Sequence, residues 1–468
     1  MKKLTSITSS LLVLSTLIIS PATAAVKAGS SCPKVGKTSV SGGKTFTCIK
    51  SGKKTVWNKG VLNAKPAVVA PTPLPTQSAT PVQLPTTSTE SDFAITGDCK
   101  LAKPSNLQMD DGPMGSVGFP KNSNAFPSTG NIKALVIFVD FPDVVASTDL
   151  KTPWLTSSIP NAEKLFAYSS YGKFKVKVDM TNKIYRMSKK STYYELLASP
   201  SGGPLPGSPP PKIDEVILDA MELADPDVDF TQYAFAVVST PESPSLALSG
   251  ASGLGPNPRK FDGVTYSAGD FIPLDSLTPL EKPYRTLNFT HDIGHMLGLM
   301  HPYQTGGPIT GTWDIMWSFA FQNDFLGWNK WKLDWITDDQ VSCINGNLKD
   351  PVTQLLTPIG VSTKGKKMVV IKLSSTSALA IEVRRKSPFE DLKSSDEGVI
   401  VYTVDSTKSQ GQGPYKIVSN TQKMITYQNF PGILGTMKPG ESVTEQGYVI
   451  SVLATSTDGD YVSVKKAS

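Results

Sequence analysis

All three histidines of the chain fall in one stretch of eleven residues, HDIGHMLGLMH, which runs from His291 to His301. His291 and His295 are four residues apart, so on a helix they share one face, one turn apart. Two imidazoles placed in this way can bind one metal ion. Gly298 lets the chain leave the helix through a left-handed turn, after which His301 can supply a third nitrogen. Three nitrogen ligands and one open position are typical of catalytic zinc, which lowers the pKa of a bound water toward ~7.

A pair of histidines four residues apart is common by chance and is often structural. In this chain no histidine occurs outside the stretch, and the third one follows a glycine at the spacing that a returning chain requires. These two features favour a zinc site over a structural role for the histidines.

The spacing HxxxHxxGxxH resembles the zinc-binding signature of the metzincin metallopeptidases. Other segments are similar to the immune inhibitor A-like secreted metallopeptidases of bacteria, in the order of that family: LVIFVDFPD (135–143), AYSSYGKFKV (167–176), ADPDVDF (224–230), GWNKWKLDWI (327–336) and EGVIVYTVD (397–405). The resemblance covers most of 130–405. It implies a secreted zinc-dependent endopeptidase that hydrolyses peptide bonds of extracellular proteins, with protein or peptide substrates.

The resemblance also implies a methionine beneath the metal, and Met316 lies fifteen residues after His301, where such a Met-turn would fall. Tyr303 follows the last histidine by two residues, and it could either polarise a substrate carbonyl or cap the turn. The family often has an acidic third ligand where this chain has His301, and imidazole suits zinc equally well.

The second departure from the family concerns the catalytic base, because Asp292 stands where the family normally has Glu. In this class the carboxylate takes a proton from the zinc-bound water and later gives it to the leaving amine. The stem of Asp is one methylene shorter, and a misplacement of roughly 1 Å can cost about 10²-fold in rate. Asp292 is therefore read as a working base in an adjusted site, as the base of a slow enzyme, or as part of a zinc-binding relic; retained activity is favoured.

Two other functions stay open. The chain could be a catalytically weak or inactive zinc-binding surface or adhesion protein derived from that family. It could also be an adhesin of the cell wall whose useful part is a basic N-terminal module.

The elements that would position the site follow from hydrophobic patterning. Apolar or alternating runs predict strands at 132–141, 174–180 and 233–239, and helical spacing predicts helices at 161–168 and 213–224. Segments 200–211 and 240–260 are rich in Pro, Gly and Ser and predict loops. Residues 260–271 could be an edge strand that pairs with substrate, or an internal strand. After residue 350, short strands at 369–373, 378–384, 398–404, 448–453 and 460–464 predict a β-sandwich-like domain.

We therefore expect an α+β fold, with a metzincin-like zinc peptidase domain at 97–347 and a C-terminal β domain at 348–468. Residues 1–24 have the charged, apolar and small-residue order of a signal peptide. A small disulfide-closed β module is expected at 25–64, and a Pro/Thr/Ser-rich linker at 65–96. The product would be secreted, with cell-wall association through the module as an open alternative.

Charge is distributed unevenly along the 468 residues. The net charge is +6, yet residues 26–65 hold nine Lys and no acidic residue, so the remainder of the chain is net negative. This balance argues against a nucleic-acid enzyme, and it suggests that the basic module could hold anionic wall polymer. No apolar run beyond the N-terminus is long enough to span a bilayer.

Four cysteines in an exported chain suggest two disulfides. Cys32 and Cys48 are close in sequence and are expected to pair, which leaves Cys99 and Cys343 as the second pair; a free Cys99 thiolate blocking a metal is the rival. Asp140 and Asp143 could bind Ca²⁺, although turn capping is favoured. Five tryptophans near the site are expected to pack beneath it rather than to bind wall polymer: Trp313, Trp317, Trp328, Trp331 and Trp335.

Overall fold

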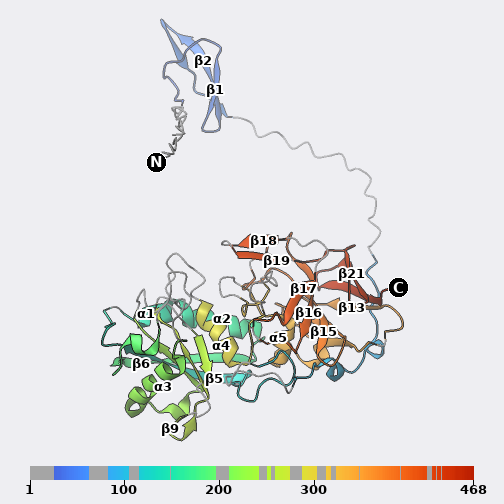
Figure 1. Ribbon diagram of the computed structural model, residues 1–468. Helices are drawn as coiled ribbons and strands as arrows, with labels where there is room; N and C mark the ends of the chain where they lie inside the picture. The colour runs from blue at the N-terminus through green and yellow to red at the C-terminus, as the bar shows by residue number, and fades with distance from the viewer. Residues whose placement is uncertain are drawn as a thin grey trace, which may run out of the picture. The chain divides into compact units, whose positions relative to one another are not determined.

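The structure is a computed structural model. In it the chain folds into two compact units, Met1–Val82 and Gln83–Ser468 (Figure 1). It describes residues 26–62, 83–104, 115–147, 149–196, 210–241, 250–253, 259–274, 287–302, 313–317, 323–346, 348–390, 392–409, 411–418, 424–427, 430–433 and 435–468. The predicted signal peptide lies outside the described residues. None of the described helices combines the length and the apolar character needed to cross a membrane.

The first unit contains a small sheet of four strands, β1 (Thr38–Ser41), β2 (Lys44–Ser51), β3 (Lys54–Trp57) and β4 (Val61–Leu62). β2 pairs with the other three strands, all antiparallel. A disulfide joins Cys32 to Cys48, as the sequence suggested, and these two residues form the core together with Phe46 and Trp57. Such a small core gains stability from a covalent link.

The second unit begins before the end of the predicted linker. The Ser88 amide donates to the Thr353 carbonyl, and Ala94 forms an antiparallel bridge with Cys343. The sequence had assigned Ser88 and Ala94 to the linker, whereas these contacts place them on the second unit.

A five-stranded sheet with the order β6-β5-β7-β11-β8 organises the first half of this unit. Its members are β5 (Gly130–Asp140), β6 (Phe174–Arg186), β7 (Phe235–Ser239), β8 (Gly250–Gly253) and β11 (Ala268–Phe271). All neighbours are parallel except β8, which runs antiparallel to β11. The hairpin of β9 (Lys260–Phe261) and β10 (Val264–Thr265) precedes β11. β11 lies between β7 and β8 in this sheet. Of the two predictions for 260–271, an edge strand that pairs with substrate or an internal strand, the internal strand is therefore correct for β11.

Helices cover both faces of this sheet (Figure 1). The even-numbered side chains of β5, such as Val136, pack in one core with α2 (Ile159–Ser169) and α4 (Asn288–Met296). The odd-numbered ones, such as Ile137, pack in another core with α3 (Ile213–Ala224). Short helical turns at α1 (Lys151–Pro153) and at residues 154–158 lead into α2. Burial on both faces explains why 132–141 is a continuous apolar run.

Two further sheets form the C-terminal half of this unit. Together with the helices and the sheet of the first half, they give the chain a mixed helix and sheet content. One has the order β12-β14-β15-β16-β17 and the other β13-β22-β21-β20, and a shared apolar core lies between them, as in a β-sandwich. The strands are β12 (Val341–Ile344), β13 (Val352–Leu356), β14 (Met368–Lys372), β15 (Ser377–Arg384), β16 (Gly398–Asp405), β17 (Tyr415–Val418), β20 (Ser442–Glu445), β21 (Tyr448–Thr455) and β22 (Asp460–Lys466). A separate hairpin contains β18 (Met424–Tyr427) and β19 (Phe430–Ile433).

The two halves of the second unit share a core built around α5 (Gly327–Lys332). Trp328 and Trp331 of this helix pack with β14–β17 and with Cys99, whose disulfide to Cys343 is the pairing expected from the sequence. All five tryptophans near the site are buried, with at most 9% of their surface exposed. These tryptophans pack in the interior, as predicted. They therefore form no exposed aromatic surface that could bind a wall polymer.

Candidate metal centre

Helix α4 carries two of the three histidines into the interior. His291 and His295 are 4% and 3% exposed, and every residue of α4 is buried. Their rings approach one another edge to face, with centroids 4.7 Å apart. A buried imidazole pair on one helix face is the arrangement that the spacing predicted.

The chain leaves α4 through a Schellman turn. Gly298 adopts a left-handed φ of 94°, and its amide donates to the His295 carbonyl while the Leu299 amide donates to the Gly294 carbonyl. The Lys332 ammonium, from α5, donates to the Gly298 carbonyl at 3.2 Å. The predicted left-handed turn is thus confirmed, and it returns the chain so that His301 faces the helix.

The three rings converge on one point. Their Nε2 atoms lie 3.0 Å apart for His291 and His301, 3.1 Å for His291 and His295, and 3.2 Å for His295 and His301. Tetrahedral zinc, with bonds of about 2.0–2.1 Å, keeps its nitrogen ligands roughly 3.3–3.4 Å apart. The three separations are thus within about 0.4 Å of those in a tetrahedral zinc site, so a small outward movement of the rings would admit an ion. Among the described residues the triad is also the only group of three or more His, Cys, Asp or Glu side chains that could hold a metal ion.

Two backbone carbonyls fix the ring orientations. His291 Nδ1 lies 2.8 Å from the Ile315 carbonyl oxygen, and His295 Nδ1 lies 2.9 Å from that of Leu299. A carbonyl only accepts, so each Nδ1 carries the proton and each Nε2 presents a lone pair to the shared point. Such outer hydrogen bonds are the usual support of metal-binding histidines.

Burial keeps these rings in the form that binds a metal. It lowers the pKa of His291 to about 4, against the opposing effect of the hydrogen bond to Ile315. It also lowers the pKa of His295 well below its ordinary value, and the neighbouring rings of His301 and His291 add to this effect. His291 and His295 are therefore neutral at pH 7, and neutral imidazole is the ligand form. The donor set of three imidazoles matches a borderline cation such as Zn²⁺ in number and type.

Met316 lies directly against α4 between the two helical histidines. A Cβ atom built on Gly294 would come within 2.2 Å of the Met316 sulfur. The methionine is fully buried, and its amide donates to Asp314 Oδ1 at 2.8 Å. The expected Met-turn residue is therefore next to the helix that carries the ligands, and Gly294 is required there for space.

Asp292 is 4% exposed, and its Oδ2 has no hydrogen-bond partner among the described residues. Burial raises its pKa well above the ordinary value, and the charge of Asp270 raises it further. Asp270 lies on β11, is 1% exposed, and accepts a hydrogen bond from the Phe271 amide at 2.8 Å. Burial raises the pKa of Asp270 to about 7. A buried carboxyl oxygen without a partner beside an imidazole triad fits a site completed by a cation, since a metal charge favours the ionised form.

Sequence reasoning did not single out Asp270. The available signal was an acidic residue inside the short apolar strand AGDF, a position that charged residues occupy rarely without a reason. Tyr303, the proposed carbonyl polariser, lies outside the described residues.

The other acidic candidates have ordinary partners. The Asp140 carboxylate binds the Arg186 guanidinium and the Ala146 amide, and Asp143 accepts from the amide and hydroxyl of Ser191. Of these contacts only the one to Ala146 is local, so the two carboxylates are engaged by an ion pair and by a residue 48 positions away rather than by the turn capping that the sequence favoured over calcium.

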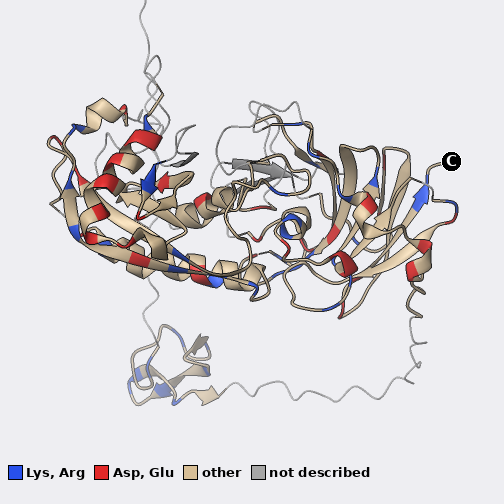
Figure 2. Ribbon diagram, turned by 90° about the horizontal axis from the view of Figure 1, so that it is seen from below, with Lys and Arg blue, Asp and Glu red and all other residues tan. Residues whose placement is uncertain are grey.

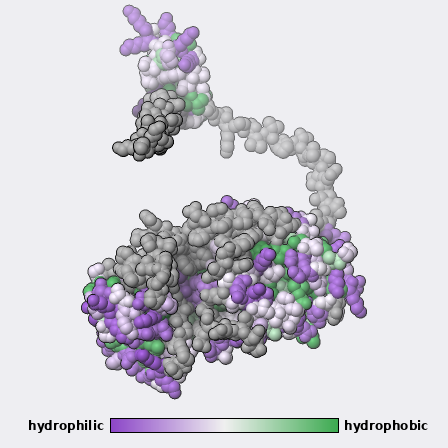
Figure 3. Space-filling model, viewed as in Figure 1, coloured by the Kyte–Doolittle hydropathy of each residue, from purple (hydrophilic) through white to green (hydrophobic). Residues whose placement is uncertain are grey.

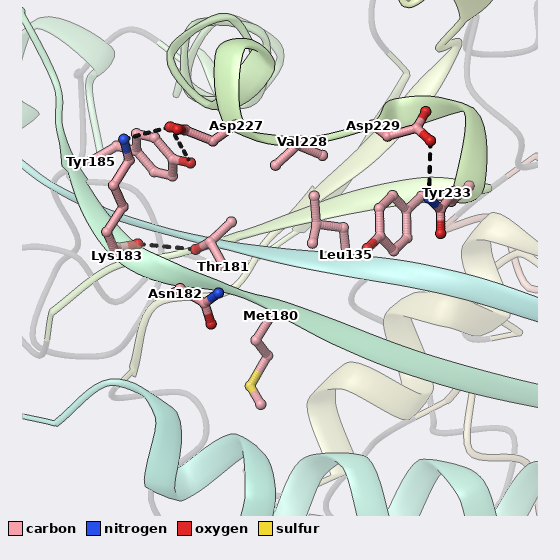
Figure 4. A pocket seen from close by; sticks show the side chains of 11 residues that line it. Leu135, Met180, Thr181, Asn182, Lys183, Tyr185, Asp227, Val228, Asp229 and Tyr233 are labelled. Carbon is pink, nitrogen blue, oxygen red and sulfur yellow. Dashed lines mark hydrogen bonds and ion pairs between the residues drawn. The ribbon is translucent and has the colours of Figure 1, made fainter.

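A polar pocket of about 410 Å³ lies away from the histidines, between β5, β6 and the segment 227–233 (Figure 4). Its two acidic residues are engaged: Asp227 binds Lys183 and Tyr185, and Asp229 accepts from Gln232. No residue of the histidine triad lines this pocket, so it is separate from the candidate metal centre.

Compared with known proteins, the chain matches no protein-family model and no curated protein. The residues of the site therefore carry the functional proposal.

Proposed function

We propose that the protein is a secreted zinc-dependent endopeptidase. The observation that carries this proposal is the convergence of three imidazole nitrogens on one point, with two of the rings oriented by backbone carbonyls. The metzincin-like spacing of the histidines and the position of Met316 against Gly294 support the same activity.

In the proposed mechanism, His291, His295 and His301 hold the ion. Zinc bound there would supply Lewis acidity toward a peptide carbonyl and would acidify a water molecule. Asp292 would accept a proton from the attacking water and pass it to the leaving amine. Asp292 has to be ionised for this role, and both its burial and the Asp270 charge oppose ionisation by raising its pKa.

A catalytically weak zinc-binding protein is the second candidate. It is favoured by the pairing of Asp292 with another buried carboxyl, Asp270, since this pair resists ionisation. The two candidates differ in turnover and not in metal content.

The deciding experiment incubates the purified mature protein with denatured casein, with and without a chelator, and measures bound zinc in the same sample. Chelator-sensitive cleavage with about one zinc per chain supports the peptidase. Bound zinc without cleavage supports the second candidate, and a chain that binds no zinc contradicts both.

Export is part of the proposal. The signal-like N-terminus and the absence of free cysteines among the described residues both suit an oxidising compartment. Pulse labelling should find the mature chain outside the cell; a chain retained inside would remove this part.

The first unit suggests an additional role as a binding module for an anionic wall polymer. Between Val26 and Leu62 there are eight Lys and no acidic residue, so none of these lysines has an ion-pair partner within the module (Figure 2). Hydrophobic residues also reach its surface (Figure 3). Val40 and Val61 flank Thr45 in register across three strands, and they are 66% and 68% exposed. An exposed sheet face surrounded by unpaired cations is suited to a polyanion.

This role can be tested with isolated cell walls from which anionic polymer has or has not been extracted. A chain lacking 26–82 should keep its peptidase activity and lose salt-sensitive binding to the untreated walls. The deletion stops at Val82 because Ser88 already pairs with the second unit. Equal binding by both chains, or binding that ignores salt, would rule out the role.

A further inference from the structure

The segment 313–317 lies between the metal centre and the C-terminal β domain. On one side, the Ile315 carbonyl accepts from His291 Nδ1 at 2.8 Å, and Met316 packs against Gly294. The backbone position of this segment therefore sets both the orientation of one ligand ring and the support beneath α4.

Asp314 anchors the segment from within. Its Oδ1 accepts from the Met316 amide at 2.8 Å, and its Oδ2 accepts from the Leu326 amide at 2.7 Å and from Asn329 Nδ2 at 2.8 Å. Asn329 Oδ1 in turn accepts from the Tyr415 hydroxyl at 2.6 Å. Since Tyr415 belongs to β17, this chain of hydrogen bonds crosses from the metal centre into the C-terminal sheet.

Arg384, at the end of β15, reaches the same segment. One terminal nitrogen donates to the Trp313 carbonyl at 2.9 Å, and the other donates to the Phe325 carbonyl at 3.2 Å. The guanidinium also lies over the Trp313 ring, 5.4 Å from its centroid. One fixed donor and a stacked face thus hold the backbone at Trp313, and the second donor holds Phe325, a geometry that a flexible ammonium could not reproduce.

Acidic residues of the same β domain balance the buried guanidinium. Glu382 accepts from it at 2.7 Å, and Glu390 accepts from its Nε at 2.7 Å. Glu382 also accepts from the Gly327 amide and from the Tyr402 hydroxyl. We name this group the junction cluster; its members are Asp314, Asn329, Glu382, Arg384, Glu390, Tyr402 and Tyr415.

A buried ion network of this kind is weak evidence for stability, because apolar side chains of similar size often stabilise a fold as well or better. The junction cluster has a more specific feature: Arg384 donates to the backbone of the segment that orients a ligand histidine, and Asp314 accepts from it. We propose that Arg384 and Tyr415 are positioning residues of the metal centre, acting through segment 313–317 and the Ile315 carbonyl. The C-terminal β domain is then part of the metal site and not an independent appendage. This inference rests on metal binding by the triad, which the proposed function includes.

The test compares zinc affinity in four variants of the full mature chain. Arg384→Lys keeps the charge and removes the fork of donors, and Tyr415→Phe removes one hydroxyl. Their matched controls lie in the same domain: Arg385→Lys changes an arginine that binds Asp460, and Tyr448→Phe changes a buried tyrosine of β21. Zinc affinity is measured by competition with a chelating dye, and Co²⁺-substituted protein reports ligand geometry through its visible spectrum.

Arg384→Lys is expected to weaken zinc binding roughly 10-fold or more, the usual effect of losing outer support of metal ligands. Tyr415→Phe should weaken it less, by about threefold. Both should shift the cobalt spectrum, while the two controls stay at the wild-type affinity and spectrum. Unfolding of the metal-free protein is followed in parallel to separate local from general destabilisation.

Wild-type zinc affinity and an unchanged cobalt spectrum in Arg384→Lys and Tyr415→Phe would overturn the proposal, even if both variants unfold more easily. If Arg384→Lys does not fold, Tyr415→Phe decides. A wild-type chain that binds zinc and cleaves nothing would overturn the peptidase function alone, because the affinity measurements would still test the positioning role.

Discussion

The metal centre and the junction cluster are two buried polar groups that are satisfied in opposite ways. In the metal centre, burial keeps His291 and His295 neutral, and the Nε2 atoms of the three rings face one another. In the junction cluster, the positive Arg384 is enclosed by Glu382 and Glu390. The first group could be completed by an external cation, as proposed, whereas the second is completed within the protein. Metal removal should therefore act on the first, and loss of one charge should act on the second.

The largest effect is expected at the ligands. His295→Ala should abolish zinc binding and lower the rate of casein cleavage by at least about 10³-fold, because Lewis acidity is worth several kcal/mol. The far-UV circular dichroism spectrum should stay that of the wild type, since the junction cluster keeps all its partners. Loss of the spectrum together with the metal would mean that the two groups are not separable in this way.

Removal of the buried guanidinium should damage the fold itself. Arg384→Met leaves Glu382 and Glu390 buried without their partner, and it is expected to lower the free energy of unfolding by about 3–5 kcal/mol. Urea unfolding of the metal-free protein measures this loss. Replacing both glutamates by Gln in the same variant should recover part of the lost free energy of unfolding. A loss below about 1 kcal/mol in Arg384→Met would contradict the expectation that the junction cluster depends on its internal charges.

The reach of Asp292 can be tested by changing its length. If the short stem limits the reaction, Asp292→Glu should increase the rate of casein cleavage, by up to about 10²-fold. Asp292→Asn, the control, should abolish cleavage and leave the zinc content intact. An unchanged or lower rate in Asp292→Glu would indicate a pocket built around Asp, and full activity in Asp292→Asn would remove this residue from the mechanism.

The smallest effect concerns pH and the metal-free protein. The folded state lowers the pKa of His291 from about 6.5 to about 4, so the unfolded chain binds more protons in this interval. The contribution of His291 to the free energy of unfolding is complete above pH 6.5. It is lost as the pH falls toward 4, by on the order of 1 kcal/mol per pH unit. Urea unfolding between pH 7 and 5 measures this slope. The lowered pKa of His295 adds to the slope in the same direction, so His291→Gln should reduce the slope without removing it. Equal slopes in the two proteins would show that His291 does not contribute.

Local patterning predicted the main elements of the fold. The run at 132–141 became β5 and helical spacing at 213–224 became α3, because hydrophobic periodicity depends only on nearby residues. β8 was expected to be a loop, since GASG has no β-propensity. Its strand conformation comes from antiparallel pairing with β11, which lies more than ten residues further along the chain.

The sequence by itself determined the three imidazoles and the turn that brings them together. A spacing of four on a helix and a glycine at the Schellman position are local constraints, so His291, His295 and His301 could be assigned without coordinates. Only the tertiary structure decided which groups surround them. Asp270 reaches Asp292 through the order of strands in the sheet, and Arg384 reaches Trp313 across 71 residues. Such partners depend on long-range packing, which leaves no periodic trace in the sequence near the site.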